Sequence, residues 1–386
     1  MRVRSHRWLL LLATLISSQI GATAAPEKIT FPSGDDLLIT ADVYIQCSDR
    51  QTPFIVLFHQ ASWSRGEYNE TAPRLNGLGF NCMAIDQRSG GSINGVTNET
   101  KQRATIAGKG TTFIDAIPDM LAAIAYAKAN YADGAVIGFG SSYSSALILK
   151  LAGDDASLVD GVASFSPGEY FTNLGQPSNY IRTSAANIAG PVFITSRRNE
   201  QANWQSIFDA ISSAEKVSFL PTTSGQHGSR ALWAEFSDSD AYWRALEPYL
   251  AQWLPSLAKF RAAHGLAEDG SDDLSSAAGD GVTNLIKYAL GIAPADQAAA
   301  GDLPAVLEVE GSNYFQLQRL KNRTDIRYSV ETSRNPNATE WDEIWNSEDN
   351  AYAGGTDPVE QVMVRLPDDL GELFARLRIT VPSPSP

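Results

Sequence analysis

The sequence has few cysteines and few histidines, and each shortage limits the chemistry available to it. Its 386 residues include two cysteines, Cys47 and Cys82, and four histidines. Two cysteines are too few for a disulfide scaffold, and their spacing does not match a metal site. Any reaction that needs an imidazole must therefore use one of very few positions.

Long apolar runs are missing after the first residues. The chain opens with the basic stretch MRVRSHR, the apolar stretch WLLLLATLISSQI and the small-residue pattern Ala22-Thr23-Ala24. This order predicts a bacterial-type export signal over residues 1–24. The apolar stretch is too short for a comfortable membrane span. We therefore expect an exported protein, periplasmic or extracellular, without a membrane span.

Positive charge is also scarce. Loss of the signal removes Arg2, Arg4 and Arg7, so 27 of the 30 basic residues remain against 44 acidic residues, a net charge of −17. Nucleic acids bind basic surfaces, so this balance argues against a nucleic-acid partner.

Short apolar runs alternate with helix-like segments up to about residue 256. The runs are PFIVLFH, NCMAID, GAVIGFG, VDGVASFS and PVFITS, and two strands around a turn precede them in KITFPSGDDLLITADVYIQC. Continuous apolar strands separated by helices indicate a parallel sheet covered on both faces. The sequence predicts a doubly wound α/β domain over residues 25–256.

The composition changes beyond this domain. Residues 257–302 are acidic and rich in small residues, and we interpret them as a linker that contains one short helix in VTNLIKYALGIAP. Residues 303–381 hold alternating segments separated by turn signals, which predict a small all-β domain. The last residues, 382–386, predict a disordered tail.

The stretch GFGSSYSS, residues 138–145, offers four serines at a strand-to-helix turn. A nucleophile at such a turn needs small residues two positions before and two positions after it. Ser142 meets this rule with Gly140 and Ser144. Ser144 also meets it but would lie half a turn into the helix, whereas the other two serines would place Tyr143 at a tight position. We select Ser142, and a simple helix-capping turn is the alternative.

A serine nucleophile needs a general base, and histidine is the usual one. Beyond the signal the chain has His59, His227 and His264. His59 precedes the serine, where we expect it to fix a loop, and His264 lies beyond the domain. His227 follows the last predicted strand, as the order serine, acid, histidine requires. An ordinary exposed loop histidine is the alternative.

The acid and the oxyanion donors follow from the same arrangement. Glu200, after the run PVFITS, is our first choice for the acid, and Glu169, after the preceding strand, is the alternative. Either one could instead be an ordinary surface glutamate. Tyr143 supplies one backbone N–H group to the oxyanion, and Ala61 or Gln60, in the loop HQASW, supplies the other.

Five segments resemble, in order and spacing, the α/β-hydrolase superfamily, particularly its dienelactone-hydrolase-like and small-esterase branches: FHQASW, AIDQRSGG, GFGSSYSSALIL, PVFITSRRNE and GQHG. The resemblance implies an eight-stranded, mostly parallel sheet and a Ser142–Glu200–His227 triad that uses no cofactor. The sequence departs from the pattern at Gln60, where a glycine usually follows the histidine, at Ser144, and in using glutamate as the acid.

The segment AAGDGVTNLIKYALGIAP is similar to dockerin-related and EF-hand-like calcium loops of multidomain secreted bacterial proteins. Calcium loops of this kind use oxygen ligands at alternating positions and a final bidentate glutamate. Asp280 and Asn284 are present, but Ser276 and Ala278 occupy earlier ligand positions, and Lys287 replaces the glutamate. We interpret the segment as a structural relic without a metal. The β domain resembles modules found beside such segments, and the sequence does not identify a partner for this domain.

The predicted activity is the hydrolysis of small esters. Only 24 residues separate Ser166 from Pro191, where lipases of this fold often carry a lid, so a short-chain or aryl ester is the expected substrate. The alternative is an exported binding or surface protein that keeps the fold without the chemistry.

The two cysteines admit two states. Cys47 ends the second predicted strand and Cys82 begins the antiparallel strand beside it. Export makes one disulfide between them possible, and two free buried thiols are the alternative.

Overall fold

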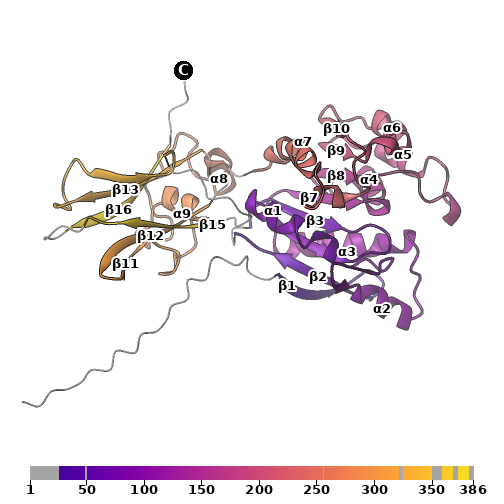
Figure 1. The fold of residues 1–386 in the computed structure, drawn as a ribbon, viewed down its shortest axis with the longest axis horizontal. Coiled ribbons are helices and arrows are strands. Elements are labelled where there is room, and N and C mark those ends of the chain that lie inside the picture. Colours follow the sequence, from indigo (N-terminus) through magenta and orange to yellow (C-terminus); the bar gives the residue numbers. More distant parts are fainter. Residues whose placement is uncertain are drawn as a thin grey trace, which may run out of the picture.

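The computed structural model describes residues 26–47, 50–254, 256–320, 323, 325–349, 359–367 and 373–381. The predicted export signal and the predicted disordered tail lie outside these residues. The described chain forms an α/β part and a β-rich C-terminal part beside it (Figure 1). Within the described residues, no helix combines the length and the apolar character needed to cross a membrane.

The α/β part is built on an eight-stranded sheet with the order β1-β2-β4-β3-β7-β8-β9-β10. β2 pairs antiparallel with β1 and β4, and every other pairing is parallel. The strands are β1 (Glu27–Pro32), β2 (Leu38–Tyr44), β3 (Phe54–Phe58), β4 (Asn81–Ile85), β7 (Val136–Ser141), β8 (Gly161–Phe165), β9 (Val192–Thr195) and β10 (Lys216–Phe219). This is the predicted α/β-hydrolase fold.

Helices cover both faces of this sheet because its strands are apolar on both sides. In β3, Phe54 and Val56 pack into one core cluster, whereas Ile55 and Leu57 pack into the other. The first cluster includes side chains from α2 (Glu99–Ile106), α3 (Ile117–Asn130), α4 (Tyr143–Asp154), α5 (Tyr180–Ala185) and α6 (Gln201–Ala210). The second includes side chains from α1 (Thr71–Gly77) and α7 (Ser239–Ala251). A short hairpin, β5 (Ser92–Ile93) and β6 (Val96–Thr97), completes this part.

The C-terminal part contains two three-stranded antiparallel sheets, β11-β12-β15 and β14-β13-β16. Their strands are β11 (Ala305–Val309), β12 (Ser312–Leu320), β13 (Arg327–Ser333), β14 (Asp342–Asn346), β15 (Val359–Arg365) and β16 (Phe374–Thr380). The segment predicted as a linker also contributes to the core of the C-terminal part. Its helices α8 (Leu257–Ala263) and α9 (Asn284–Leu290) bury Phe260 and Tyr288 in the same core cluster as these strands.

A buried lysine lies in the calcium-loop-like segment. The Lys287 side chain is fully buried, and its Nζ donates to the carbonyl oxygens of Pro294 at 3.0 Å and Asp296 at 2.6 Å. The same Nζ forms an ion pair with Asp280 Oδ2 at 3.1 Å. An ammonium group thus satisfies the oxygens gathered here. Among the described residues, no group of three or more His, Cys, Asp or Glu side chains could hold a metal ion.

The possible disulfide is absent, because both cysteines are free and buried. Cys47 lies beyond the end of β2, and its Sγ is 3.3 Å from the carbonyl oxygen of Gly291, in the C-terminal part. Cys82 is in β4 and packs into the second core cluster. The two thiols therefore have different surroundings although their strands are adjacent.

Candidate active site

The turn between β7 and α4 holds Ser142. β7 ends at Ser141 and α4 begins at Tyr143, and Ser142 between them has φ 58° and ψ −122°. A positive φ is strained for a residue with a side chain and is typical of a nucleophile at a strand-to-helix turn. A Cβ atom at Gly140 would lie 2.5 Å from the Cα of Ser145, so the turn requires glycine there.

The two serines after this turn bond to the backbone. Ser144 Oγ donates to the carbonyl oxygen of Phe58 at 2.7 Å, and Ser145 Oγ donates to the carbonyl oxygen of Ser142 at 2.6 Å. Their hydroxyl groups stabilise the junction of strand and helix. Ser142 Oγ lies instead against the ring of His227.

His227 links the serine to an acid. It lies in the loop between β10 and the 3-10 helix η5 (Ser229–Leu232). Its Nε2 is 2.8 Å from Ser142 Oγ, and its Nδ1 is 2.7 Å from Glu200 Oε1. With a proton on Nδ1, Nε2 is free to accept the serine proton. The three side chains come from separate loops, because Glu200 lies 27 residues and Ser142 lies 85 residues before His227 in the chain.

Glu200 is suited to hold this ring. It ends the 3-10 helix η4 (Arg198–Glu200) after β9 and is 6% exposed. Burial raises its pKa, but the hydrogen bond and charge of His227 and the charge of Arg197 outweigh that effect, so the pKa of Glu200 lies below its usual value. Glu200 is therefore ionised when His227 becomes protonated.

The alternative acid, Glu169, has a different role. Its two carboxylate oxygens accept hydrogen bonds from the backbone N–H groups of Ile181 and Arg182, each at 2.9 Å. These donors belong to the first turn of α5, where such groups have no partner within the helix. The structure thus brings Glu200, and not Glu169, to His227.

The oxyanion donors differ in one respect from the sequence analysis. The backbone N–H of Gln60 donates to Glu67 Oε2 at 2.7 Å, so it is not directed at a substrate. Among the described residues, no acceptor takes the N–H of Ala61 or of Tyr143. These two groups follow neighbouring parallel strands, in which Phe58 pairs with Gly140. Ala61 and Tyr143 are therefore the candidate donors.

His59 fixes the loop that contains Ala61. It is fully buried, with Nδ1 2.8 Å from the carbonyl oxygen of Gln60, and its Nε2 accepts from the backbone N–H of Gln87 at 2.9 Å. Burial lowers the pKa of His59 to about 4, so the ring stays neutral near pH 7. His264 lies just after α8, where its ring contacts Phe260.

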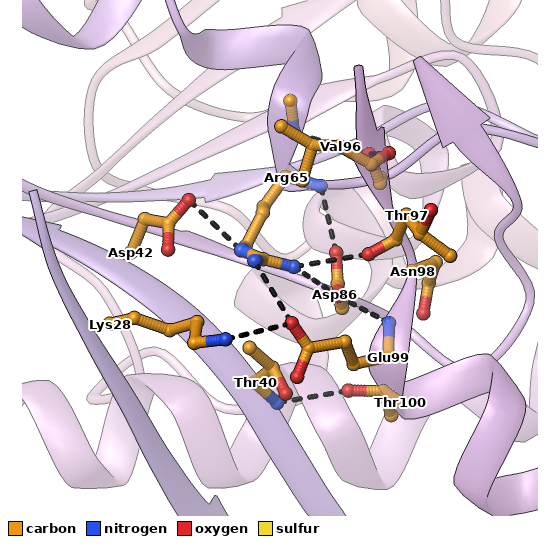
Figure 2. Close-up of polar contacts among 12 residues, drawn as sticks. Lys28, Thr40, Asp42, Arg65, Asp86, Val96, Thr97, Asn98, Glu99 and Thr100 are labelled. Atoms are coloured by element: carbon orange, nitrogen blue, oxygen red, sulfur yellow. Dashed lines mark hydrogen bonds and ion pairs between the residues drawn. The ribbon is translucent and has the colours of Figure 1, made fainter. Parts of the chain in front are cut away.

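A charged network that sequence analysis missed anchors the same loop. Arg65 begins the 3-10 helix η1 (Arg65–Tyr68), and Figure 2 shows its guanidinium among three carboxylates. The ion pairs are to Asp86 at 2.7 Å, Asp42 at 2.9 Å and Glu99 at 3.3 Å. No motif marks Arg65 in the sequence. The only available signal was a charged residue inside a segment that follows a buried strand.

An aromatic pair lies beside these loops. Trp63, in the loop after β3, stacks on Trp233, which follows η5, with ring centroids 5.4 Å apart. Trp233 is 8% exposed, whereas Trp63 is half-buried. Trp63 thus presents partly exposed aromatic surface two residues from the candidate donor Ala61.

Comparisons with known proteins find only distant similarities. No family model matches the chain, and no curated protein matches it. Among solved structures, the esterase Pf2001 of Pyrococcus furiosus has 16% identity and a TM-score of 0.46, covering 59% of this chain and 92% of its own. A dienelactone hydrolase of Anabaena variabilis has 14% identity and a TM-score of 0.46, covering 60% and 100%.

Est1E of Butyrivibrio proteoclasticus, with ferulic acid bound, has 12% identity and a TM-score of 0.44, covering 58% of this chain and 98% of its own. These values are too low to assign an activity. The fold assignment rests on the strand order of the sheet and on the strained turn between β7 and α4.

Proposed function

We propose that the protein is an exported serine hydrolase that cleaves small carboxylic esters through Ser142, His227 and Glu200. The observation that carries the proposal is the continuous hydrogen-bonded chain from Ser142 Oγ through the imidazole to Glu200 Oε1, with distances of 2.8 and 2.7 Å. A nucleophile, a base and an orienting acid within hydrogen-bond reach are the parts that acyl transfer requires.

The first half of the reaction forms an acyl-enzyme. His227 Nε2 takes the proton of Ser142 as its Oγ attacks the acyl carbon of the ester. The carbonyl oxygen becomes an oxyanion, which accepts hydrogen bonds from the N–H groups of Ala61 and Tyr143. When the tetrahedral intermediate collapses, the C–O bond to the alcohol breaks, and His227 gives its proton to the departing oxygen.

The second half uses the same groups on water. His227 takes a proton from a water molecule, which attacks the acyl carbon attached to Ser142. The new oxyanion accepts hydrogen bonds from the same two N–H groups. Collapse breaks the bond to Ser142 Oγ, which recovers its proton from the imidazole, and the carboxylic acid leaves. Glu200 remains ionised throughout and stabilises each imidazolium.

The substrate class follows from the loops around the site. Between Ser166 and Pro191 the chain forms only the 3-10 helix η3 (Thr172–Leu174) and the short α5. The partly exposed ring of Trp63 offers a flat apolar surface near the oxyanion donors. An aromatic ring stacks favourably on such a surface, so we propose short-chain and aryl esters.

Labelling with a fluorophosphonate tests this proposal. The mature protein is treated with the reagent and the labelled peptide is mapped. We expect modification of Ser142, and its loss in Ser142→Ala and His227→Ala. Ser212→Ala is the matched control, because its hydroxyl donates to the carbonyl oxygen of Ile188 near the amino ends of β9 and β10, and it should label normally.

The negative result is equally informative. A mature protein that remains unlabelled at Ser141, Ser142, Ser144 and Ser145 has no activated serine at this turn, which would refute the hydrolase proposal. It would leave an exported binding protein on a hydrolase fold. If Ser142 is labelled, p-nitrophenyl esters of increasing acyl length should show the highest kcat/KM for the shortest acyl groups.

A further inference from the structure

Glu67 is a fully buried carboxyl group between the loops of the candidate site. It belongs to η1, the 3-10 helix that Arg65 begins. Its Oε2 accepts the backbone N–H of Gln60 at 2.7 Å. Gln60 directly precedes Ala61, the candidate oxyanion donor. Glu67 Oε2 therefore fixes the peptide N–H of Gln60, and the next N–H along the chain is the one of Ala61 that would face the substrate.

The other carboxylate oxygen reaches the histidine loop. Glu67 Oε1 accepts the hydroxyl of Ser229 at 2.6 Å, and Ser229 lies two residues after His227. Trp233, further along the same segment, donates its Nε1–H to the backbone carbonyl of Glu67 at 3.0 Å. The histidine loop is thus attached to Glu67 through both its side chain and its backbone.

The nucleophile strand joins the same cluster through Ser141. Ser141 Oγ accepts the backbone N–H of Ser229 at 2.9 Å, and the Ser141 hydroxyl acts to lower the pKa of the nearby Glu67 carboxyl group. Ser141 directly precedes Ser142. Glu67 consequently bonds to Gln60 and Ser229 and lies near Ser141, all within two residues of the candidate groups, without a hydrogen bond to Ser142 or His227.

The surroundings of Glu67 oppose its charge. Burial raises the pKa of Glu67 to about 7, although hydrogen bonds from Ser141, Ser229 and Gln60 act against that effect. The titratable groups that face it are His227, Tyr68 and Tyr143. An ionised Glu67 accepts stronger hydrogen bonds than a neutral one.

We propose that Glu67 is a positioning residue for acyl transfer: its ionised carboxylate holds the oxyanion loop, the nucleophile strand and the histidine loop in register. The proposal rests on the proposed function, because it concerns the geometry of that reaction. A displacement of about 1 Å between reacting groups costs roughly a hundredfold in rate, so a shared anchor affects every step.

The test uses the pH dependence of the fluorophosphonate labelling rate of Ser142. His227 must lose a proton to act as base, which gives a slope of one on the acid side of a logarithmic plot. Loss of a second proton, from Glu67, makes the wild-type slope exceed one. Glu67→Gln keeps the reach of the side chain without its titration, so its slope should return to one.

Two further variants separate positioning from simple packing. Glu67→Ala removes the anchor, and we expect its labelling rate to fall about a hundredfold above pH 7, where the wild-type carboxylate is ionised, and to show a slope of one on the acid side. Glu247→Gln is the matched control for loss of one negative charge, since Glu247 forms a half-exposed ion pair with Arg74. It should retain the wild-type rate and slope. Thermal unfolding of each variant verifies that it is folded.

The outcomes distinguish the two proposals. Equal slopes and rates in the wild type and in folded Glu67→Gln and Glu67→Ala would refute the positioning role while leaving the hydrolase intact. Absence of label at Ser142 in the wild type would refute the hydrolase and the positioning role together. A steeper wild-type slope that Glu67→Gln abolishes supports the role of Glu67.

Discussion

At the scale of single residues, two glutamates that the sequence could not separate have different environments. Glu200 is 2.7 Å from His227 Nδ1, whereas Glu169 caps the first turn of α5. Both follow a strand of the parallel sheet, so position along the chain does not distinguish them. What distinguishes them is which groups the tertiary structure places opposite each carboxylate.

The first prediction concerns these two acids. We expect Glu200→Gln to lower kcat by at least about a thousandfold, because an amide cannot stabilise the imidazolium of His227. Glu169→Gln should lower kcat much less, since it changes only the cap of α5. Ester hydrolysis by the two purified variants provides the measurement. A larger loss in Glu169→Gln than in Glu200→Gln would mean that Glu169 is the acid.

Sequence analysis could identify Ser142 and His227 as candidates because local rules apply to them. The size rule at the turn excludes Ser141 and Ser145, the position of Ser144 in the helix argues against it, and histidine is rare in this chain. Gln60 was one of two alternatives for the second oxyanion donor, but its N–H is bonded to Glu67. Glu67 in turn bonds to Ser229, 162 residues further along the chain. No local pattern reports a contact between residues so far apart.

At the scale of helices and strands, the elements predicted from the sequence agree best with the structure where the apolar pattern is strongest. β3 and β7 are buried on both faces and therefore form the continuous apolar runs that were predicted. α2 was missed because it has no apolar stripe, since its only buried residues are Thr100 and Ala104. The predicted linker contains two helices whose few apolar residues pack against strands more distant in the sequence.

The second prediction concerns α9. Lys287→Met removes the ammonium group that neutralises Asp280 and satisfies two carbonyl oxygens. Because these oxygens would lose their only described cation, we expect a lower Tm. Calcium should leave the Tm of the wild type unchanged, since the ammonium already occupies the position. A calcium-dependent rise in the wild-type Tm would contradict this interpretation.

At the scale of the whole molecule, the candidate site and the C-terminal part lie at opposite ends of the sheet. Ser142, Glu200 and His227 follow the carboxyl ends of β7, β9 and β10. The pocket between the two parts is lined by residues at the amino ends of strands, including Pro53 and Ala135, and by Tyr288. The C-terminal part therefore packs at the amino ends of these strands and not at the ends that the candidate site follows, and Figure 1 shows it beside the α/β part.

The third prediction concerns the pH dependence of global stability. In the folded chain the pKa of Glu67 is about 7, above its ordinary value of 4.5. The stabilising contribution of the protonated Glu67 to the free energy of unfolding is therefore fully present below about pH 4.5, and it is lost as the pH rises to about 7. A shift of this size corresponds to roughly 3 kcal/mol. We expect Glu67→Gln to gain stability relative to the wild type between pH 5 and pH 8.

Urea unfolding of the wild type and of Glu67→Gln at pH 5 and pH 8 provides the measurement. The difference between their free energies of unfolding cancels the contribution of every other titrating group. Relative stability that does not change with pH would show that Glu67 keeps an ordinary pKa in the folded protein.

The backbone of Ser142 has a consequence for the stability of the turn between β7 and α4. Glycine adopts a φ of 58° without strain, whereas a serine there costs about 1–3 kcal/mol. Ser142→Gly should therefore relieve strain at the turn while it removes the hydroxyl group. In that one variant, the free energy of unfolding and the proposed chemistry of the side chain would change in opposite directions.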